Sequence, residues 1–230
     1  MDKGMPRTVS IRKIVKETPK IRTFILSESF RFTPGQFVMV WVPGVDEIPM
    51  ALSGKNSVSV REVGDATTAM FALEEGDLLG IRGPYGEGFP VRGVVLAVAG
   101  GIGSAPLLPL AMEGYVGVFL LGAATEKGLP FRKILARTTA LKIATDDGSE
   151  GRRGPVTVLL KEVDLHAFDH ICVCGPEPMM KKVAEMARRK RLPLQLSLER
   201  YMKCGIGICD ACAFDDRLVC VDGPVFTGEQ

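Results

Sequence analysis

The first 91 residues alternate between apolar and polar positions in short segments, a pattern typical of β-strands. Pairs such as Pro34-Gly35 and Gly83-Pro84 separate these segments and are typical of turns. Residues 67–73 lack strong strand formers, so we expect a short helix there. Several short strands at this spacing predict a small antiparallel barrel. The expected strands are residues 8–15, 21–26, 36–42, 56–62 and 77–82.

The pattern changes at Gly93. Residues 94–99 form a continuous apolar run, as expected of a strand that is buried on both faces of a parallel sheet. A glycine-rich turn follows, and then a helical stretch that ends near Met112. Further strand patterns alternate with helix patterns, which predicts an open, Rossmann-like α/β sheet. The expected strands are residues 116–122, 141–145 and 170–174, and the expected helices are residues 131–137, 156–161 and 178–191.

The predicted fold class is therefore a multi-domain α+β protein with three parts. Residues 1–91 form an N-terminal antiparallel β-barrel, residues 92–192 a parallel-sheet α/β domain, and residues 193–230 a small C-terminal cysteine module. A length of 230 residues is sufficient for two ordinary domains and such an appendix.

Composition narrows the classes of function. Hydrophobic residues make up 46% and charged residues 24%, which is ordinary for a folded globular protein. The formal net charge of +2 gives no reason to expect binding to nucleic acid or to an anionic membrane. The longest apolar runs, residues 94–99 and 116–124, are too short to span a bilayer, and no stretch resembles a secretory signal. We therefore expect a cytoplasmic protein.

Four of the six cysteines lie close together near the C-terminus: Cys204, Cys209, Cys212 and Cys220. Their C-x4-C-x2-C-x7-C spacing begins like the plant-type pattern of four thiolates around a [2Fe–2S] cluster. Gly205 and Gly207 suit such a loop, because backbone without side chains can approach the sulfurs closely. This spacing favours iron–sulfur over zinc, which more often uses two C-x2-C pairs, and over disulfides. The sequence therefore predicts a protein that transfers electrons.

The predicted sheet offers two turns that suit a phosphate-bearing ligand. Glycines follow the first strand, where backbone N–H groups can face an anion. A second turn closes the strand at residues 170–174, at the same carboxyl edge, where open α/β sheets bind ligands. Each turn also has a simpler interpretation as a plain connection between a strand and a helix. The candidate residues are Gly100, Gly101 and Gly103 in the first turn, and Cys174, Gly175 and Pro176 in the second. Cys172 is most simply a buried, reduced side chain.

The predicted barrel carries three further candidate segments. Glycine amides and threonine hydroxyls between the strands have the groups that hold a pyrophosphate, although such corners are also common in barrels without a ligand. The candidate residues are Pro49, Met50, Ala51, Leu52 and Ser53 in the first segment, Gly64, Thr67 and Thr68 in the second, and Gly83, Tyr85 and Gly86 in the third.

Taken together, these segments resemble the ferredoxin–NADP reductase superfamily along the whole chain. More narrowly, the chain resembles the electron-transfer subunits of B-type dihydroorotate dehydrogenases, because the cysteine loop follows the nicotinamide domain at the C-terminus. The motifs that match are Pro34-Gly35-Gln36-Phe37, Gly83-Pro84-Tyr85-Gly86-Glu87-Gly88-Phe89, Gly100-Gly101-Ile102-Gly103, Asp146-Asp147-Gly148-Ser149, Cys174-Gly175-Pro176 and Glu199-Arg200-Tyr201-Met202-Lys203-Cys204-Gly205.

One departure from that resemblance concerns the flavin site. The usual flavin motif is Arg-Pro-x-Ser, whereas this chain has Ile48 in place of the arginine and Ala51 in place of the serine. Flavin binding should then depend more on backbone groups, on residues 64–68 and on Ser53.

The resemblance implies a function in de novo pyrimidine (UMP) biosynthesis. An FMN-containing catalytic subunit oxidises dihydroorotate, and electrons pass through the [2Fe–2S] cluster and FAD of this subunit to NAD⁺. It implies a heterotetramer with two copies of each subunit and no catalytic side chain in this chain. Glu126, just after the second sheet strand, favours NAD over NADP because its carboxylate accepts hydrogen bonds from a ribose hydroxyl; Lys127 acts in the opposite direction.

Two other functions fit the same motifs. One is the small flavin and iron–sulfur subunit of a ferredoxin-dependent transhydrogenase or of a cytoplasmic hydrogenase, which shares this architecture. The other is a binding module that zinc stabilises and that has no redox activity.

Overall fold

The computed structural model describes residues 5–228. The chain forms two compact units. The barrel unit contains the residues up to Gly88 together with Glu199–Val225, and the sheet unit contains Phe89–Leu198 and the residues from Phe226 onward. The chain thus leaves the first unit, builds the second, and returns to the first with its cysteines.

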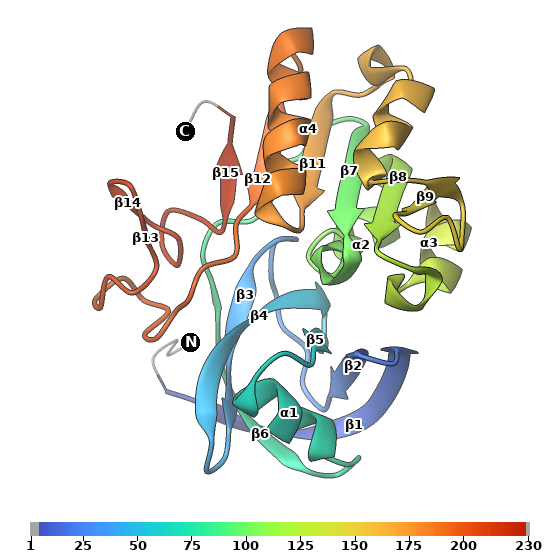
Figure 1. The fold of residues 1–230 in the computed structure, drawn as a ribbon. Coiled ribbons are helices and arrows are strands. Elements are labelled where there is room, and N and C mark those ends of the chain that lie inside the picture. The colour runs from blue at the N-terminus through green and yellow to red at the C-terminus, as the bar shows by residue number, and fades with distance from the viewer. Residues whose placement is uncertain (1–4, 229–230) are drawn as a thin grey trace. The chain divides into compact units, whose positions relative to one another are not determined.

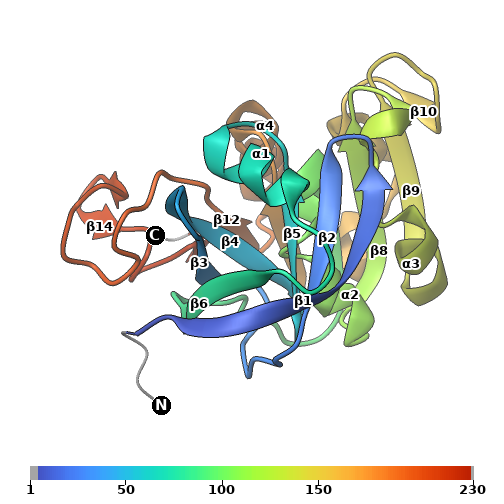
Figure 2. The ribbon, with the colours of Figure 1, turned by 90° about the horizontal axis from the view of Figure 1, so that it is seen from below.

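The barrel unit contains a closed, six-stranded antiparallel barrel, which confirms the predicted architecture. Its strands follow the order β1-β2-β5-β4-β3-β6, and Figure 2 shows the long β1 running beside β2 and β6. The sequence did not predict β4, because Pro49 in its middle reads as a break in a strand. The bounds are β1 (Arg7–Thr18), β2 (Ile21–Leu26), β3 (Phe37–Val42), β4 (Asp46–Gly54), β5 (Ser57–Arg61) and β6 (Leu78–Tyr85).

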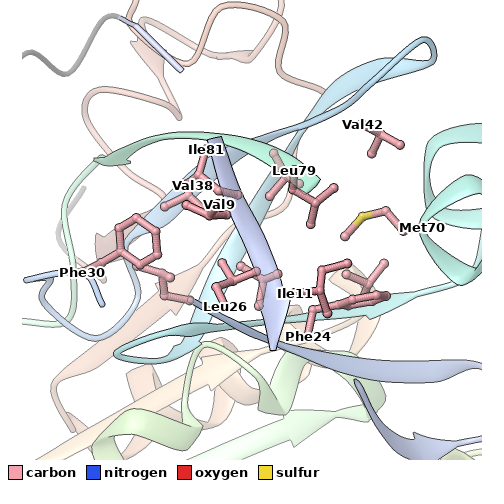
Figure 3. Packing of buried hydrophobic residues seen from close by; sticks show 14 residues of the cluster. Val9, Ile11, Phe24, Leu26, Phe30, Val38, Val42, Met70, Leu79 and Ile81 are labelled. Carbon is pink, nitrogen blue, oxygen red and sulfur yellow. The ribbon is translucent and has the colours of Figure 1, made fainter. Parts of the chain in front are cut away.

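Alternate residues of these strands fill the barrel. Phe24, Leu26, Val38 and Leu79 are fully buried in one cluster, and Figure 3 shows most of its members pointing inward from different strands. Helix α1 (Asp65–Ala72) adds Met70, which is also fully buried. The intervening residues of each strand therefore face away from this core.

The sheet unit is built on a seven-stranded sheet, as the alternation of strands and helices predicts. Its order is β10-β9-β8-β7-β11-β12-β15, and the neighbours from β10 to β12 are parallel. In Figure 1, α4 lies against β11 and β12. The bounds are β7 (Val95–Gly100), β8 (Val116–Ala123), β9 (Ala140–Thr145), β10 (Arg152–Arg153), β11 (His170–Cys174), β12 (Leu194–Ser197) and β15 (Val225–Thr227).

Most helices of the sheet unit are short, with five residues in α2 and seven in α3. Among the helices of this unit, α4 is the longest, and it buries Met180, Val183 and Ala187 on the side that packs against β11 and β12. The stretch predicted as a helix at residues 156–161 is a 3₁₀ segment, η3 (Val156–Glu162). The other bounds are η1 (Gly101–Ser104), α2 (Leu108–Met112), η2 (Glu126–Gly128), α3 (Arg132–Thr138), η4 (Leu165–Ala167) and α4 (Glu177–Lys190).

The cysteine segment contains little regular structure. It holds one two-stranded hairpin, β13 (Ala213–Phe214) with β14 (Arg217–Leu218), and is otherwise made of turns. No helix among residues 5–228 has the length and apolar content that a membrane crossing requires.

Candidate functional site: a cysteine loop on the barrel and a glycine-lined sheet edge

The four C-terminal cysteines form two pairs of sulfurs. Cys204 is hydrogen-bonded with Cys209, and Cys220 with Cys212. A [2Fe–2S] cluster takes four thiolates on two irons, so two pairs match its two metal positions. Among residues 5–228, no group of three or more His, Cys, Asp and Glu side chains is arranged to hold a metal ion as it stands. The fit to a cluster therefore rests on the two pairs and on the backbone around them.

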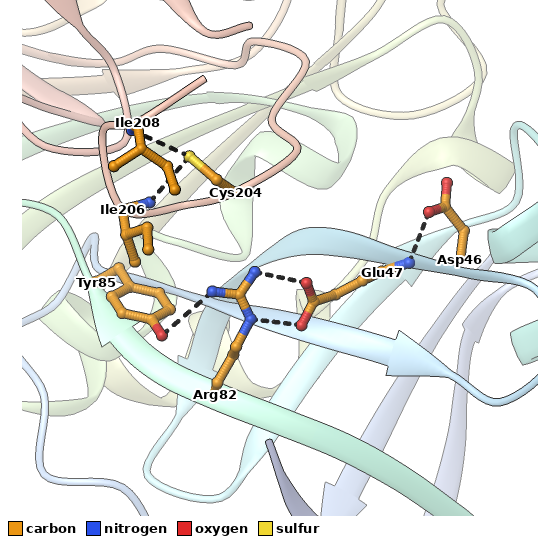
Figure 4. A network of polar contacts seen from close by, with 7 residues as sticks. All are labelled: Asp46, Glu47, Arg82, Tyr85, Cys204, Ile206 and Ile208. Carbon is orange, nitrogen blue, oxygen red and sulfur yellow. Dashed lines mark hydrogen bonds and ion pairs between the residues drawn. The ribbon is translucent and has the colours of Figure 1, made fainter. Parts of the chain in front are cut away.

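Backbone N–H groups of the loop point at the sulfurs. Ile206 and Ile208 each donate to Cys204 Sγ at 3.4 Å, as Figure 4 shows. The N–H group of Cys220 donates to Cys212 Sγ at the same distance. Such donors stabilise negative charge on sulfur, and hydrogen bonds to the ligands are one means by which a protein tunes a cluster.

Cys204 and Cys220, one from each pair, differ in how readily they ionise. At Cys204, burial raises the pKa, but the N–H groups of Ile206 and Ile208 outweigh it and lower the pKa to about 6. At Cys220, burial is the main cause of a rise in pKa to about 12, and the neighbouring Cys212 adds to it. Iron binds thiolate and displaces the proton, so Cys204 gives up its proton to metal more readily than Cys220 does.

Glycines bring the loop onto the barrel. Gly205 has a φ of 70°, and a Cβ atom there would lie 2.9 Å from Cγ of Met39. Met39 is fully buried and faces outward on β3, because its neighbours Val38 and Val40 point into the core. Gly207, with a φ of 81°, leaves no room for a Cβ beside Val221. Only glycine therefore permits this approach without strain.

An ion pair stabilises the strands beneath the loop. Arg82 on β6 donates to both carboxylate oxygens of Glu47 on β4, at 2.6 and 2.5 Å. The hydrogen bond with Glu47 raises the pKa of Arg82, whose side chain is largely buried. Arg82 is also the strand partner of Met39, so this bidentate contact spans β3 on the face that carries the loop.

The end of the cysteine segment is tied to the predicted motif at Gly83–Gly86. The N–H group of Glu87 donates to the carbonyl of Gly223 at 2.6 Å. A Cβ atom on Gly86 would collide with that carbonyl and with Pro224. The ring of Tyr85 packs 5.9 Å from that of Phe37. Of the candidate residues here, Gly86 is thus placed against the cysteine segment, and Tyr85 against Phe37.

Strand β4 divides the first group of flavin candidates between two faces. Met50 and Leu52 pack against the barrel core, as does Ile48. Ala51 and Ser53 alternate with them and face outward, together with Pro49. Phe37 is the strand partner of Ala51, and its ring also lies next to Gly205. The outward face of β4 is therefore joined to the cysteine loop through one aromatic side chain.

The hydroxyl of Thr67 is fully used within its own helix terminus. It accepts from the N–H groups of Val63 and Gly64, both at 2.9 Å, and donates to the carbonyl of Gly64 at 2.8 Å. A hydroxyl has one donor and two acceptor sites, so none remains for a phosphate. Thr68 is exposed. What α1 offers an anion is the N–H groups of its first turn.

In the sheet unit, β7 and β11 mark the point where the strand order reverses. From β7 the chain proceeds to β8 and β9 on one side, and later to β11 and β12 on the other. Open sheets bind ligands at the carboxyl ends of such strands. Both predicted turns lie there, since Ala99 pairs with Cys174 at the strand ends. The structure therefore brings the two turns together, as the sequence predicted.

These two turns touch through their glycines. A Cβ atom on Gly103 would collide with the carbonyl of Cys174, and one on Gly100 would lie 2.6 Å from Pro176. Gly175, with a φ of 149°, approaches the N–H group of Gly100 in the same way. Gly101 is different: it has a φ of 53°, and the nearest atom to its Cβ position is the carbonyl oxygen of Gly128 at 4.0 Å. The turn continues as η1 and not directly as an α-helix.

Glu126 lies exposed in η2, beyond the end of β8. Its N–H group donates to the hydroxyl of Ser149 at 2.8 Å, and that hydroxyl donates to Asp147 at 2.6 Å. The hydrogen bond from Ser149 lowers the pKa of Asp147. Ser149 thereby joins the loops that follow β8 and β9, and it ties the carboxylate of Asp147 to the backbone of Glu126.

Sequence reasoning missed the residues that seat the cysteine loop. Met39, Arg82 and Glu47 belong to no recognisable motif. They look like ordinary strand residues, and their role is seen only when the distant cysteine loop packs on them. The available signal was the alternation in β3, which places three large apolar residues, Phe37, Met39 and Trp41, on its outward face.

Replacing Gly205 by alanine should loosen the cysteine loop. The change adds left-handed strain of about 1–2 kcal/mol and a contact with Met39, so iron retention should fall. Gly44→Ala is the matched control, because Gly44 has a similar φ of 78° but nothing within 4 Å of its Cβ position. Iron per chain after anaerobic gel filtration is the measurement. Equal iron in both variants would show that contact with Met39 is irrelevant to the loop.

Iron and acid-labile sulfide should be present at about two of each per chain, the content of a [2Fe–2S] cluster. Cys209→Ser should abolish the visible iron–sulfur absorption, since it removes one ligand. Cys172→Ser should leave it intact, because Cys172 is fully buried in β11, and burial raises its pKa. Zinc in place of iron after anaerobic purification would contradict the assignment of the cluster.

Comparison with known proteins agrees with this arrangement. Residues 199–230 match the family described as the iron-sulfur cluster binding domain of dihydroorotate dehydrogenase B. A probable electron transfer subunit of dihydroorotate dehydrogenase B (NAD(+)) from Methanocaldococcus jannaschii is 49% identical, over 98% of this chain and 91% of that relative. The corresponding protein of Pyrococcus horikoshii is 47% identical, over 98% and 92% of the two chains.

Among solved structures, a chain of an NADH-dependent reduced ferredoxin-NADP oxidoreductase is similar, with a TM-score of 0.84 and 31% identity. The match covers 96% of this chain and 88% of that one. An identity of 47–49% over nearly the full length of both chains is well above what a shared fold alone requires. The chain belongs to the family of electron transfer subunits of dihydroorotate dehydrogenase B.

Proposed function

We propose that this chain carries electrons from dihydroorotate, oxidised by an FMN-containing partner subunit, through a [2Fe–2S] cluster and FAD to NAD⁺, in de novo pyrimidine biosynthesis in the cytoplasm. The observation that carries the proposal is the seat of the cysteine loop. Gly205 contacts Met39 and Phe37 on β3, and Phe37 is the strand partner of Ala51 at the proposed flavin face.

The cofactors would divide the chemistry between them. A cluster carries single electrons, a nicotinamide accepts only a hydride, and a flavin does both. The protein supplies binding and orientation. Cys204, Cys209, Cys212 and Cys220 would hold the irons, and the outward face of β4 and the first turn of α1 would hold the flavin and its diphosphate. The nicotinamide would lie along the two glycine turns at the ends of β7 and β11.

Exposed apolar side chains around the cysteine loop favour a partner there. Ile208 is 77% exposed and Tyr201 67%, and Ile206, Phe214 and Val221 are also exposed within the same segment. Such side chains, gathered beside a redox site, are typical of a protein interface. We infer that this surface, the cysteine-loop patch, binds the catalytic subunit, in a heterotetramer with two copies of each subunit.

The decisive assay combines the subunit with its catalytic partner. Dihydroorotate-dependent reduction of NAD⁺ should require both. Ile208→Glu should weaken this coupled activity and co-elution with the partner, because it places a charge in the cysteine-loop patch. Leu78→Glu is the control, since Leu78 is 53% exposed on β6, outside the patch. NADH oxidation by the isolated subunit with an artificial acceptor should be unchanged in both variants.

The alternative of a transhydrogenase small subunit draws support from the 31% identity to the ferredoxin-NADP oxidoreductase chain. The higher identity of 49% to the dihydroorotate dehydrogenase relative favours the proposed function. If the protein exchanged electrons with ferredoxin but not with dihydroorotate and its dehydrogenase, the transhydrogenase function would be favoured instead.

The coenzyme should be NAD rather than NADP. Glu126 and Asp147, joined through Ser149, place carboxylates where a 2′-phosphate would be repelled. The kcat/KM for NADH should exceed that for NADPH, and Glu126→Gln should narrow the ratio by about tenfold, the equivalent of one hydrogen bond to a charged group. Glu185→Gln, an exposed carboxylate on α4, should not change it. A preference for NADPH in the wild type would show that the positive charge of Lys127 outweighs the two carboxylates.

A further inference from the structure

One residue of the cysteine loop has a backbone conformation that most side chains avoid. Asp210 has a φ of 55°, in the left-handed region. Gly205 and Gly207 have the same conformation, and a Cβ atom at either position would collide with a neighbouring side chain. Asp210 is exposed, so its side chain has room. Glycine would adopt this backbone without strain, so the presence of aspartate here points to a role for its side chain.

The other left-handed residues with side chains lie where secondary structure begins, ends or turns. Among residues 5–228, they are Phe131 at the start of α3, Arg191 at the end of α4 and Asp215 in the turn between β13 and β14. Asp210 is next to no helix or strand, and it directly follows Cys209 inside the C-x2-C part of the cysteine spacing. The ends of neighbouring elements therefore do not account for its conformation.

The carboxylate of Asp210 has no structural partner. Aspartates in loops commonly accept a hydrogen bond from a nearby backbone N–H group. Asp222 does so in the same segment, with the N–H group of Leu218 at 2.7 Å, and Asp147 does so with that of Ser149 at 2.9 Å. Among the residues that the structure describes, no donor is bonded to the carboxylate of Asp210. This side chain therefore adds a negative charge to the loop without holding the loop together.

The backbone keeps that charge close to the cysteines. Consecutive Cα atoms are about 3.8 Å apart, so Asp210 is immediately beside Cys209. The carbonyl of Asp210 accepts a hydrogen bond from the N–H group of Ala213 at 3.0 Å, which closes a turn around Cys212. Asp210 thus adjoins one cysteine from each of the two pairs of sulfurs.

A negative charge beside a cluster opposes its reduction. Reduction adds one electron, and a nearby carboxylate raises the free energy of the more negative state. The reduction potential of a cluster depends on such charges and on the hydrogen bonds to its sulfurs. The N–H groups of Ile206 and Ile208 favour the more negative state, because they donate to Cys204 Sγ. Asp210 acts in the opposite direction.

We propose that Asp210 lowers the reduction potential of the [2Fe–2S] cluster through its charge, and so makes the reduced cluster a stronger electron donor to the flavin. The step that Asp210 favours moves one electron from cluster to flavin and breaks no bond in this chain. The proposal rests on the proposed function, since it requires a cluster held by the four cysteines. It adds to that function a residue that sets the direction in which the electron is favoured to move.

The test is a redox titration of the purified subunit at neutral pH and about 0.1 M salt, in which electron paramagnetic resonance measures the reduced cluster. Asp210→Asn keeps the shape of the side chain and tolerates a left-handed backbone, but it removes the charge. It should raise the midpoint potential by about 30–60 mV, which is about a three- to tenfold change in the ratio of reduced to oxidised cluster at 59 mV per tenfold for one electron. Asp210→Gly should raise it equally, because it removes the same charge.

Asp215→Asn is the matched control. Asp215 is also exposed and left-handed, with a φ of 51°, and it lies in the same segment. The hairpin of β13 and β14 carries it three residues beyond Cys212, about 10 Å along an extended strand. Salt screens charges over about that distance at 0.1 M, so Asp215→Asn should shift the midpoint by less than half as much as Asp210→Asn. Raising the salt to about 1 M should reduce the difference between wild type and Asp210→Asn, because a charge is its cause.

An unchanged midpoint potential in Asp210→Asn would overturn the proposal, even if this variant bound the catalytic subunit less tightly, since the carboxylate would then serve only to contact the partner. An equal shift in Asp215→Asn would also overturn it, because only the net charge of the segment would then matter. A rise in Asp210→Asn without one in Asp210→Gly would assign the effect to the new amide and contradict the proposal. A wild-type subunit that holds no iron–sulfur cluster would instead refute the proposed function itself.

Discussion

The approach of Gly205 to Met39 is the contact on which the proposed electron path depends. It places the cysteine loop directly on a barrel strand, with room for hydrogen atoms only. Met39 is in turn held between its strand partners Pro49 and Arg82, and Arg82 is paired with Glu47. Because residue 205 is a glycine, the loop can lie closer to Met39 and Phe37 than any other residue would allow.

In the sheet unit, too, glycines allow two segments of the chain to approach each other closely. Glycines at positions 100, 103 and 175 let two strand ends approach each other where the strand order reverses. In both units, then, the absence of a side chain on glycine lets two segments of the chain pack directly against each other. The chemistry of the site comes from sulfur and backbone N–H groups, with few charged side chains, as expected of a protein that leaves the reaction to its cofactors.

Much of this arrangement was predictable from the sequence. The continuous apolar run before Gly100 predicted a buried parallel strand, and the spacing from Cys204 to Cys220 predicted the cysteine loop; the barrel and the sheet are confirmed. Strand β4 was missed because Pro49 obscures its pattern, although the ladder with β3 accommodates it. The role of Thr67 was not predictable, since a hydroxyl that bonds its own turn and one that faces a ligand look alike in sequence. The seat of the loop on Met39 was also hidden, because it joins residues more than 160 positions apart.

The return of the chain to the barrel unit has a consequence for synthesis on the ribosome. Residues up to Gly88 emerge first, but Glu199–Val225, which complete that unit, emerge only after the entire sheet unit has been made. The outward face of β3, with Phe37 and Met39, therefore stays uncovered while more than one hundred residues are added. Domains generally fold as units during synthesis, so we expect the six strands to fold first, with the apolar strip formed by Phe37 and Met39 exposed to water. The cysteine loop is therefore the last part of the barrel unit to be made, and its packing covers that strip.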